Sequence, residues 1–270
     1  MPKKRTYSTG PYRERAILVG VNIRNTEEIW QLEDSLAELS ELARAAGANP
    51  VIRFTQSMNK PSPTYLGKGK IEELKQAVKR EDIDTVIFDD ELSPNQQRIL
   101  EEKLSVKVID RTALILDVFA QRARSREGRL QIELAQTEYL LPRLAGQWSH
   151  LERLGGGVGT RGPGETQIET DRRLVRRKLS RVKKELSQIR SQRDQQRQLR
   201  TSGTSKIISL VGYTNAGKSA LFNKITSSDV IQRNQLFSTL DTTTRRMYMP
   251  SGIEATISDT VAVSYTHLRA

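Results

Sequence analysis

Short apolar runs alternate with amphipathic segments over the first part of the chain. Each run has the length and the β-branched content of a buried strand, and each segment between them repeats apolar side chains at helical spacing. Strands separated by helices favour right-handed crossovers and a parallel sheet. We therefore expect a small parallel-sheet α/β domain over residues 1–111. Its strands are predicted at 15–23, 50–54, 84–90 and 106–110, and its helices at 27–47, 69–80 and 93–104.

Helix-terminating residues support these boundaries. Gly47 follows the last apolar position of the first helix and suits a C-terminal cap. Ser93 precedes Pro94 at the start of the third helix, where a hydroxyl caps free N–H groups and proline fits the first turn.

A narrower apolar stripe marks the middle of the chain. Two segments repeat apolar positions in steps of four and three residues, which predicts two helices packed as an antiparallel hairpin over residues 112–200. Pro142 lies inside the first helix and is expected to kink it. The two stripes are Leu130, Leu134, Thr137, Leu141 and Leu144, then Val175, Leu179, Val182, Leu186 and Ile189.

After a polar linker, residues 206–226 place a β-branched strand, Gly212-x4-Gly217-Lys218-Ser219 and an apolar helix in succession. This is a phosphate-binding loop in its required strand–loop–helix context. Backbone N–H groups and the helix N-terminus surround the phosphates, Lys218 reaches the β- and γ-phosphates, and Ser219 offers a hydroxyl to Mg²⁺. We therefore expect a partial P-loop nucleotide-binding domain over residues 201–270.

Polar residues downstream fit the same chemistry. The threonine-rich stretch 236–246 lies where P-loop proteins carry their first switch, and one of its threonines is expected to ligate Mg²⁺. Asp259 ends the next strand and is expected to organise the metal.

A second glycine motif, G-x-G-x-x-G, occurs at Gly157, Gly159 and Gly162. As a dinucleotide fingerprint it would need a preceding strand and a surrounding βαβ unit, and neither pattern is found there. We expect instead the tip of the helical hairpin, where the glycines allow close approach to RNA and Arg161 contacts phosphate or a base.

Charge favours a polyanionic partner. The 270 residues carry a formal net charge of +12, with a pI near 10.0, and such a surface gains affinity by releasing counterions from phosphates. The absence of cysteine suits a reducing cytosol, and the lack of a long apolar run predicts no membrane span. The second hairpin helix is expected to present an outer basic face made of Arg172, Arg173, Arg176, Arg177, Lys178, Arg181, Lys183 and Lys184.

Two further segments are weaker candidates for ligand binding. Asp89, Asp90 and Glu91 follow a predicted strand, and we favour turn capping and solvation over a metal site. The stretch Gly67 to Lys70 offers a helix N-terminus to anions, but the signal is weak.

The strings "GGGVGTRGPGETQIETDRR", "LVGYTNAGKSALFN" and "LFSTLDTTTRR" closely resemble the HflX family of translational GTPases, which belongs with the Obg/HflX-like P-loop GTPases. "YLGKGKIEEL" and "FDDELSPNQQRILEE" extend the resemblance over essentially residues 15 to 260. It implies a cytoplasmic GTP-binding hydrolase, expected as a monomer. It also implies association with the large ribosomal subunit, splitting or rescue of stalled ribosomes, and a role in the stress response.

The resemblance also assigns residues. Lys218, Thr239 and Asp259 are the implied catalytic group, with Thr242 and Thr243 as rivals of Thr239. Ser219 and Thr239 are the implied Mg²⁺ ligands, and Asn215 is the implied partner of a K⁺ ion. The implied GTP/GDP-binding loop is Gly212, Tyr213, Thr214, Asn215, Ala216, Gly217, Lys218, Ser219 and Ala220. The tip residues Gly157, Gly159, Arg161 and Gly162 are implied to face ribosomal RNA near the peptidyl-transferase region.

The chain departs from the family pattern at its C-terminal end. The D-x-x-G motif ends in Ala262, and the guanine-reading N-K-x-D motif does not occur. We therefore expect a truncated GTPase domain. Two hypotheses stay open: a ribosome-stimulated GTPase, or a nucleotide-independent ribosomal-RNA-binding module with an inactive GTPase domain.

Overall fold

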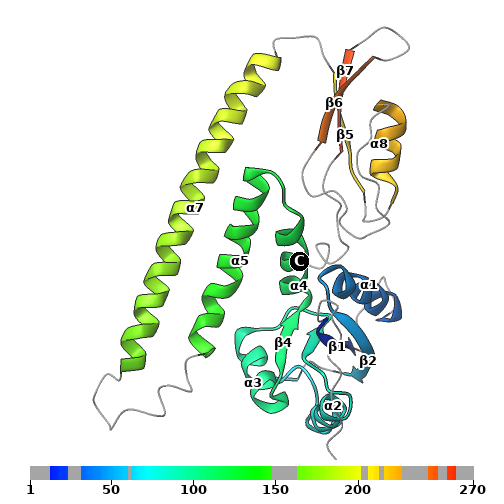
Figure 1. Cartoon of the computed structure of the whole chain (residues 1–270), viewed down its shortest axis with the longest axis vertical. Helices are drawn as coiled ribbons and strands as arrows, with labels where there is room; N and C mark the ends of the chain where they lie inside the picture. The colour runs from blue at the N-terminus through cyan, green and yellow to red at the C-terminus, as the bar shows by residue number, and fades with distance from the viewer. Residues whose placement is uncertain are drawn as a thin grey trace, which may run out of the picture. The chain divides into compact units, whose positions relative to one another are not determined.

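A computed structural model of the chain describes residues 13–23, 32–59, 62–147, 163–201, 206–212, 216–226, 243–248 and 254–259. It contains two compact units, Met1–Ile115 and Leu116–Ala270, and each is described by itself (Figure 1).

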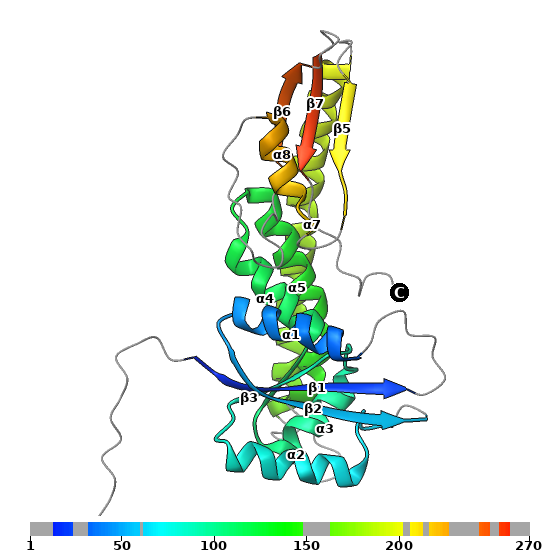
Figure 2. The ribbon, with the colours of Figure 1, turned by 90° about the vertical axis from the view of Figure 1, so that its right-hand side faces the viewer.

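The first unit is built on a four-stranded parallel sheet with the strand order β2-β1-β3-β4. The predicted α/β class and parallel sheet are confirmed. Figure 2 shows helices α1 and α2 on opposite sides of the β1–β2 pair. The strands are β1 (Arg15–Ile23), β2 (Asn49–Met58), β3 (Thr85–Phe88) and β4 (Lys107–Asp110), and the helices are α1 (Leu32–Ala45), α2 (Lys68–Arg80), α3 (Pro94–Leu104) and the start of α4 (Arg111–Arg122).

Side chains of β1 alternate between the two faces of the sheet, as the two-residue period of a strand requires. Ile17, Val19 and Val21 join the core formed with α2 and α3. On the opposite face, α1 approaches Gly20 so closely that a Cβ there would lie 2.7 Å from Leu32 Cδ1. Both faces of the sheet are therefore covered, which explains why the central strands β1 and β3 are nearly continuous apolar runs.

Local capping fixes the helix ends where the sequence predicts them. Ser93 Oγ accepts the Gln96 N–H, and Gln96 Oε1 accepts the Ser93 N–H, which completes a capping box ahead of Pro94. Gly47 takes φ +96° just after α1, a conformation that glycine adopts without a Cβ penalty. Strand β2 runs to Met58, four residues beyond its predicted end, because it remains paired with β1 as far as Ile23.

Helices α5 (Arg126–Gln147) and α7 (Pro163–Thr201) form the predicted hairpin, side by side in Figure 1. Leu130, Val182 and Leu186 are buried in its seam. Ion pairs join Arg126 to Glu185 and Glu133 to Lys178, so residue numbers rise along one helix as they fall along the other. The hairpin is therefore antiparallel.

Helix α5 continues through Pro142, which lacks the N–H of that turn. The Arg143 guanidinium lies 3.4 Å from the centroid of the Tyr139 ring and donates to the Tyr139 carbonyl at 2.9 Å. These side-chain contacts bridge the turn that contains the proline.

The last part of the chain forms a three-stranded sheet with the order β5-β7-β6. Strand β5 (Lys206–Leu210) is parallel to β7 (Glu254–Asp259), and β6 (Thr243–Tyr248) is antiparallel to β7. Helix α8 (Lys218–Thr226) follows β5. Strand β6 is not predicted from the sequence, because its threonine and arginine residues match a loop better than an apolar strand.

Candidate phosphate-binding site

The predicted phosphate loop connects β5 to α8. Gly212, Gly217, Lys218 and Ser219 lie within the described residues, as do Ala216 and Ala220, whereas the stretch 213–215 lies outside them. Gly217 has φ +82°, with open space where a Cβ would stand. This backbone conformation explains why the loop has glycine directly before the helix.

Asp259 reaches the loop through the strand order. Strands β5 and β7 are parallel neighbours, with Leu210 paired to Asp259, so their carboxyl ends lie at the same edge. There the Ser219 hydroxyl donates to Asp259 Oδ2 at 2.7 Å, and Asp259 is fully buried. The prediction that places Asp259 beside the phosphate loop is supported by a contact between residues 40 positions apart.

The charges at this edge act on Lys218 in opposite directions. Partial burial lowers the pKa of Lys218, and the nearby negative charge of Asp259 raises it. The ammonium group thus lies near a buried carboxylate at the N-terminus of α8. Phosphate oxygens bound there would replace the water that partial burial removes from the ammonium group.

The donor set suits Mg²⁺. A hydroxyl from Ser219 and a carboxylate from Asp259 are oxygen ligands, which this small cation prefers together with phosphate oxygens. The two groups are close enough to hold one ion between them, directly or through water.

Several predicted site residues lie outside the described residues. They include the switch candidates Thr239 and Thr242, the potassium candidate Asn215 with its neighbours Tyr213 and Thr214, and the tip residues Gly157, Gly159, Arg161 and Gly162. Thr243, the third switch candidate, begins β6 and is paired in register with Asp259.

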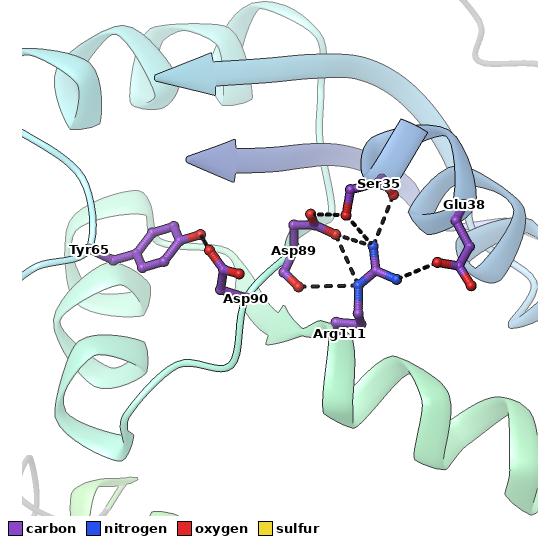
Figure 3. Close-up of polar contacts among 6 residues, drawn as sticks. All are labelled: Ser35, Glu38, Tyr65, Asp89, Asp90 and Arg111. Atoms are coloured by element: carbon purple, nitrogen blue, oxygen red, sulfur yellow. Dashed lines mark hydrogen bonds and ion pairs between the residues drawn. The ribbon is translucent and has the colours of Figure 1, made fainter. Parts of the chain in front are cut away.

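The carboxyl edge of the N-terminal sheet holds a second polar cluster, drawn in Figure 3. Arg111, the first residue of α4, is 2% exposed and donates to both the carboxylate and the backbone carbonyl of Asp89. It also donates to Glu38 Oε2 at 2.9 Å and to the Ser35 carbonyl at 2.9 Å. The Ser35 hydroxyl donates in turn to Asp89 Oδ2 at 2.5 Å.

Asp90, the next residue, belongs to a different contact. The Tyr65 hydroxyl donates to Asp90 Oδ2 at 2.5 Å, and the Tyr65 ring packs edge-on against Phe88. Burial raises the pKa of Tyr65, and the negative charge of Asp90 raises it further. The hydroxyl therefore keeps its proton and remains a donor.

The expectation of turn capping and solvation is wrong for Asp89. The side chain is buried and paired with a guanidinium, because an unpaired buried carboxylate would be too costly. Among the described residues, no group of three acidic or histidine side chains is placed to hold a metal ion. Arg111, Ser35 and Glu38 are not predicted from the sequence to belong to this cluster. An arginine directly after the strand 106–110, with acidic residues after the strand 84–90, is the signal that could have indicated it.

A glycine loop between a strand and a helix, with a lysine, a hydroxyl and a buried aspartate at its mouth, defines a P-loop nucleotide-binding protein. Three protein-family models match successive parts of the chain. They are GTP-binding GTPase N-terminal at residues 33–120, GTP-binding GTPase Middle Region at 122–200, and 50S ribosome-binding GTPase at 207–269. The chain belongs to the HflX family of GTPases.

Individual relatives agree with this assignment. The GTPase HflX of Alkalihalophilus pseudofirmus is 49% identical over 249 residues, which make up 92% of this chain and 58% of the relative. The GTPase HflX of Escherichia coli is 47% identical over 249 residues, with the same coverage of 92% and 58%. The chain thus spans 58% of the length of these two curated relatives.

A solved structure shares the fold. The crystal structure of SsGBP in complex with GDP has a TM-score of 0.52 and 22% sequence identity, and the match covers 92% of this chain and 63% of that one. Among the described residues of this chain, no helix is long and apolar enough to cross a membrane.

Proposed function

We propose that the protein binds and hydrolyses GTP with Mg²⁺, and that it acts at the large ribosomal subunit to split or rescue stalled ribosomes. The observation that carries the nucleotide part is the contact between Ser219 and Asp259 beside Lys218. It brings a metal-ligating hydroxyl, a metal-organising carboxylate and a phosphate-binding cation to one helix N-terminus.

The roles follow from chemistry. Lys218 neutralises the β- and γ-phosphates, Ser219 ligates Mg²⁺, and Asp259 orients the ion. Thr239 completes the metal shell from the first switch, and Asn215 accompanies a K⁺ ion that adds positive charge beside the phosphates. Guanine preference and the ribosomal partner come from the family, whose GTPase region matches residues 207–269.

Lys218→Ala tests the nucleotide site. We expect it to weaken GTP binding at least about tenfold, because removing one partner of a buried charge pair costs roughly 2–5 kcal/mol. Lys224→Ala is the matched control: it removes an exposed lysine from the same helix α8. Labelled GTP and ATP are titrated against the chain and both variants with Mg²⁺ and K⁺, and GTP hydrolysis is measured alongside. Unchanged binding and hydrolysis in the Lys218 variant would overturn the proposal.

A second candidate function is ribosomal-RNA binding that does not require nucleotide. It is supported by the basic residues of α7, several of which form no ion pair with any described residue. If this chain binds large subunits in a salt-sensitive manner but binds no nucleotide, the second function is favoured for it.

The hairpin tip is tested separately. Replacing Gly157, Gly159 and Gly162 by alanine is expected to weaken ribosome binding or splitting and to leave GTP affinity intact, because the tip and the phosphate loop are different segments. The reverse result would return the glycine motif to a nucleotide-binding role.

A further inference from the structure

Acidic residues of α5 divide the basic side chains of α7 into two sets. Lys178 pairs with Glu133 at 3.0 Å, and Lys183 pairs with Glu138 at 2.8 Å. Arg193 pairs with Glu127 at 2.9 Å. These three cations flank the apolar seam and are neutralised within the hairpin, so Lys178 and Lys183 do not belong to the outer basic face predicted from sequence.

The other set is exposed and has no such partner. Arg172, Arg173, Arg176, Arg177 and Lys184 form no ion pair with any residue that the structure describes. At about 100° per residue, Arg173, Arg177 and Lys184 lie within about 40° of one another, opposite Val182 and Leu186 of the seam. We call these three residues the outer row.

The outer row has a defined length and composition. At about 1.5 Å per residue it spans roughly 16 Å along α7. Further along the same side, Gln188, Ser191 and Gln195 are exposed and uncharged. The positive charge of the outer row therefore ends at Lys184, and Glu185 pairs with Arg126 and Arg181 away from the row.

Helix stability does not explain this arrangement. Arg172 with Arg176, and Arg173 with Arg177, are like charges four residues apart, and each such pair costs a helix about 0.2–0.5 kcal/mol. The fold offers these cations no acidic partner among its described residues in return. These cations are therefore available to a negatively charged partner from outside the chain.

We propose that the outer row binds the phosphodiester backbone of a double-helical nucleic acid. One strand carries a phosphate about every 3.4 Å of helix axis, so a row of roughly 16 Å passes several phosphates. Arginine suits this contact because its guanidinium binds phosphate with two parallel hydrogen bonds. An anionic membrane is a poorer fit, because a membrane-surface helix needs an exposed apolar face and the α7 stripe packs against α5.

This inference deepens the proposed ribosomal role by adding a nucleic-acid surface on the shaft of the hairpin. Its test needs no nucleotide and no ribosome. Loss of GTP binding in Lys218→Ala, with duplex binding retained, would separate the two proposals.

Two triple variants of the chain, equal in charge change, provide the experiment. The outer variant carries Arg173→Gln, Arg177→Gln and Lys184→Gln, and the flank variant carries Lys178→Gln, Lys183→Gln and Arg193→Gln. Binding to a short RNA duplex is measured by fluorescence anisotropy over a salt series, and folding is checked by circular dichroism. Glutamine is a good helix former, so the exposed outer variant is expected to fold.

We expect the outer variant to bind the duplex at least about tenfold more weakly and to lose about 2–3 from the slope of log affinity against log salt, near 0.9 for each phosphate contact. The flank variant should keep its affinity and melt at a lower temperature, because three glutamates of α5 lose their partners. Equal loss in both variants would reduce the effect to net charge and overturn the proposal, as would no loss in the outer variant.

Two further arms identify the source of the phosphates. If the outer variant loses affinity for a DNA duplex as much as for the RNA duplex, recognition of the backbone alone is supported. If it loses affinity for the RNA duplex but not for the DNA duplex, recognition of A-form geometry is supported. Binding of anionic vesicles that depends on the outer row, without duplex binding, would overturn the proposal in favour of a membrane partner.

Discussion

The molecule contains two carboxyl edges of parallel strands, and they are built in opposite ways. In the N-terminal sheet, the polar groups after β3 and β4 satisfy one another: Arg111 fills the space beside Asp89, and Tyr65 holds Asp90. In the second sheet, the edge at β5 and β7 has a glycine loop, a lysine and a hydroxyl bound to a buried aspartate.

The difference shows that a carboxyl edge is a place for a ligand only when its polar groups are left for one. Open α/β sheets commonly bind ligands there. At the first edge, which we call the closed edge, the guanidinium of Arg111 lies where a ligand would bind, and the acidic residues pair with it. At the second edge, which we call the open edge, Gly212 and Gly217 have no Cβ, and the backbone is therefore accessible to phosphate.

Removing Arg111 from the closed edge should have the largest effect on stability. Arg111→Met is expected to cost about 3–5 kcal/mol of the free energy of unfolding, because it leaves Asp89 and Glu38 as uncompensated charges. Chemical denaturation of the chain measures this loss. Arg98→Met, which removes a partly exposed pair with Glu102, is the matched control and should cost less than about 1 kcal/mol.

A double-mutant cycle sharpens that result. Adding Asp89→Leu to Arg111→Met should cost less than the sum of the two single changes, since the second removes the charge that the first leaves unpaired. Additive losses, or a loss under about 1 kcal/mol for Arg111→Met, would mean that the cluster does not hold the edge closed.

The open edge should respond to backbone conformation. Gly217→Ala forces an alanine into φ +82° and is expected to cost roughly 1–2 kcal/mol, or about tenfold in GTP affinity. Gly69→Ala is the control, because Gly69 has no positive φ and no neighbour within 4 Å of an added Cβ. Isothermal titration with GTP and Mg²⁺ compares them. Equal affinities in the two variants would contradict a phosphate-binding conformation at Gly217.

The sequence predicts the open edge far better than the closed one. A phosphate loop is a local motif, so Gly217, Lys218 and Ser219 are recognisable from spacing, and Asp259 from its strand end. The cluster around Arg111 joins residues as far apart as Ser35 and Arg111, 76 positions, and only the strand order shows that they meet. The parallel sheet and the capping box at Ser93 follow from local patterns. Strand β6 does not, because pairing with β7 decides it.

The loop of the closed edge offers a smaller test. Ser93→Ala removes the side-chain cap of α3 and is expected to cost about 1 kcal/mol. The change should also speed amide exchange at Leu92, which directly precedes Ser93 and donates its N–H to Asp110 Oδ2 at the end of β4. Asn95→Ala, an exposed change in the first turn of α3, is the control. Equal stability of the two variants would mean that the cap contributes nothing to holding the loop.

Tyr65 provides the most specific test of the closed edge, because its effect depends on pH. Tyr65→Phe removes one hydrogen bond to Asp90 and should cost about 1–2 kcal/mol at neutral pH, since the acceptor is charged. The pKa of Tyr65 is raised in the folded state by burial and by Asp90, whereas an unfolded tyrosine ionises near pH 10, about its ordinary value. The contribution of the protonated hydroxyl is therefore fully present below about pH 10 and is lost as the pH rises beyond it.

Above pH 10, the wild-type chain should lose up to about 1.4 kcal/mol per pH unit through this one group, and the phenylalanine variant should decline less steeply by that amount. Tyr248→Phe is the control, because Tyr248 is 74% exposed and should leave the alkaline decline unchanged. Denaturant unfolding at a series of alkaline pH values compares the three chains. If the wild type and the Tyr65 variant decline in parallel, Tyr65 ionises as readily in the folded chain as in the unfolded one, and the edge at Asp90 is open to water.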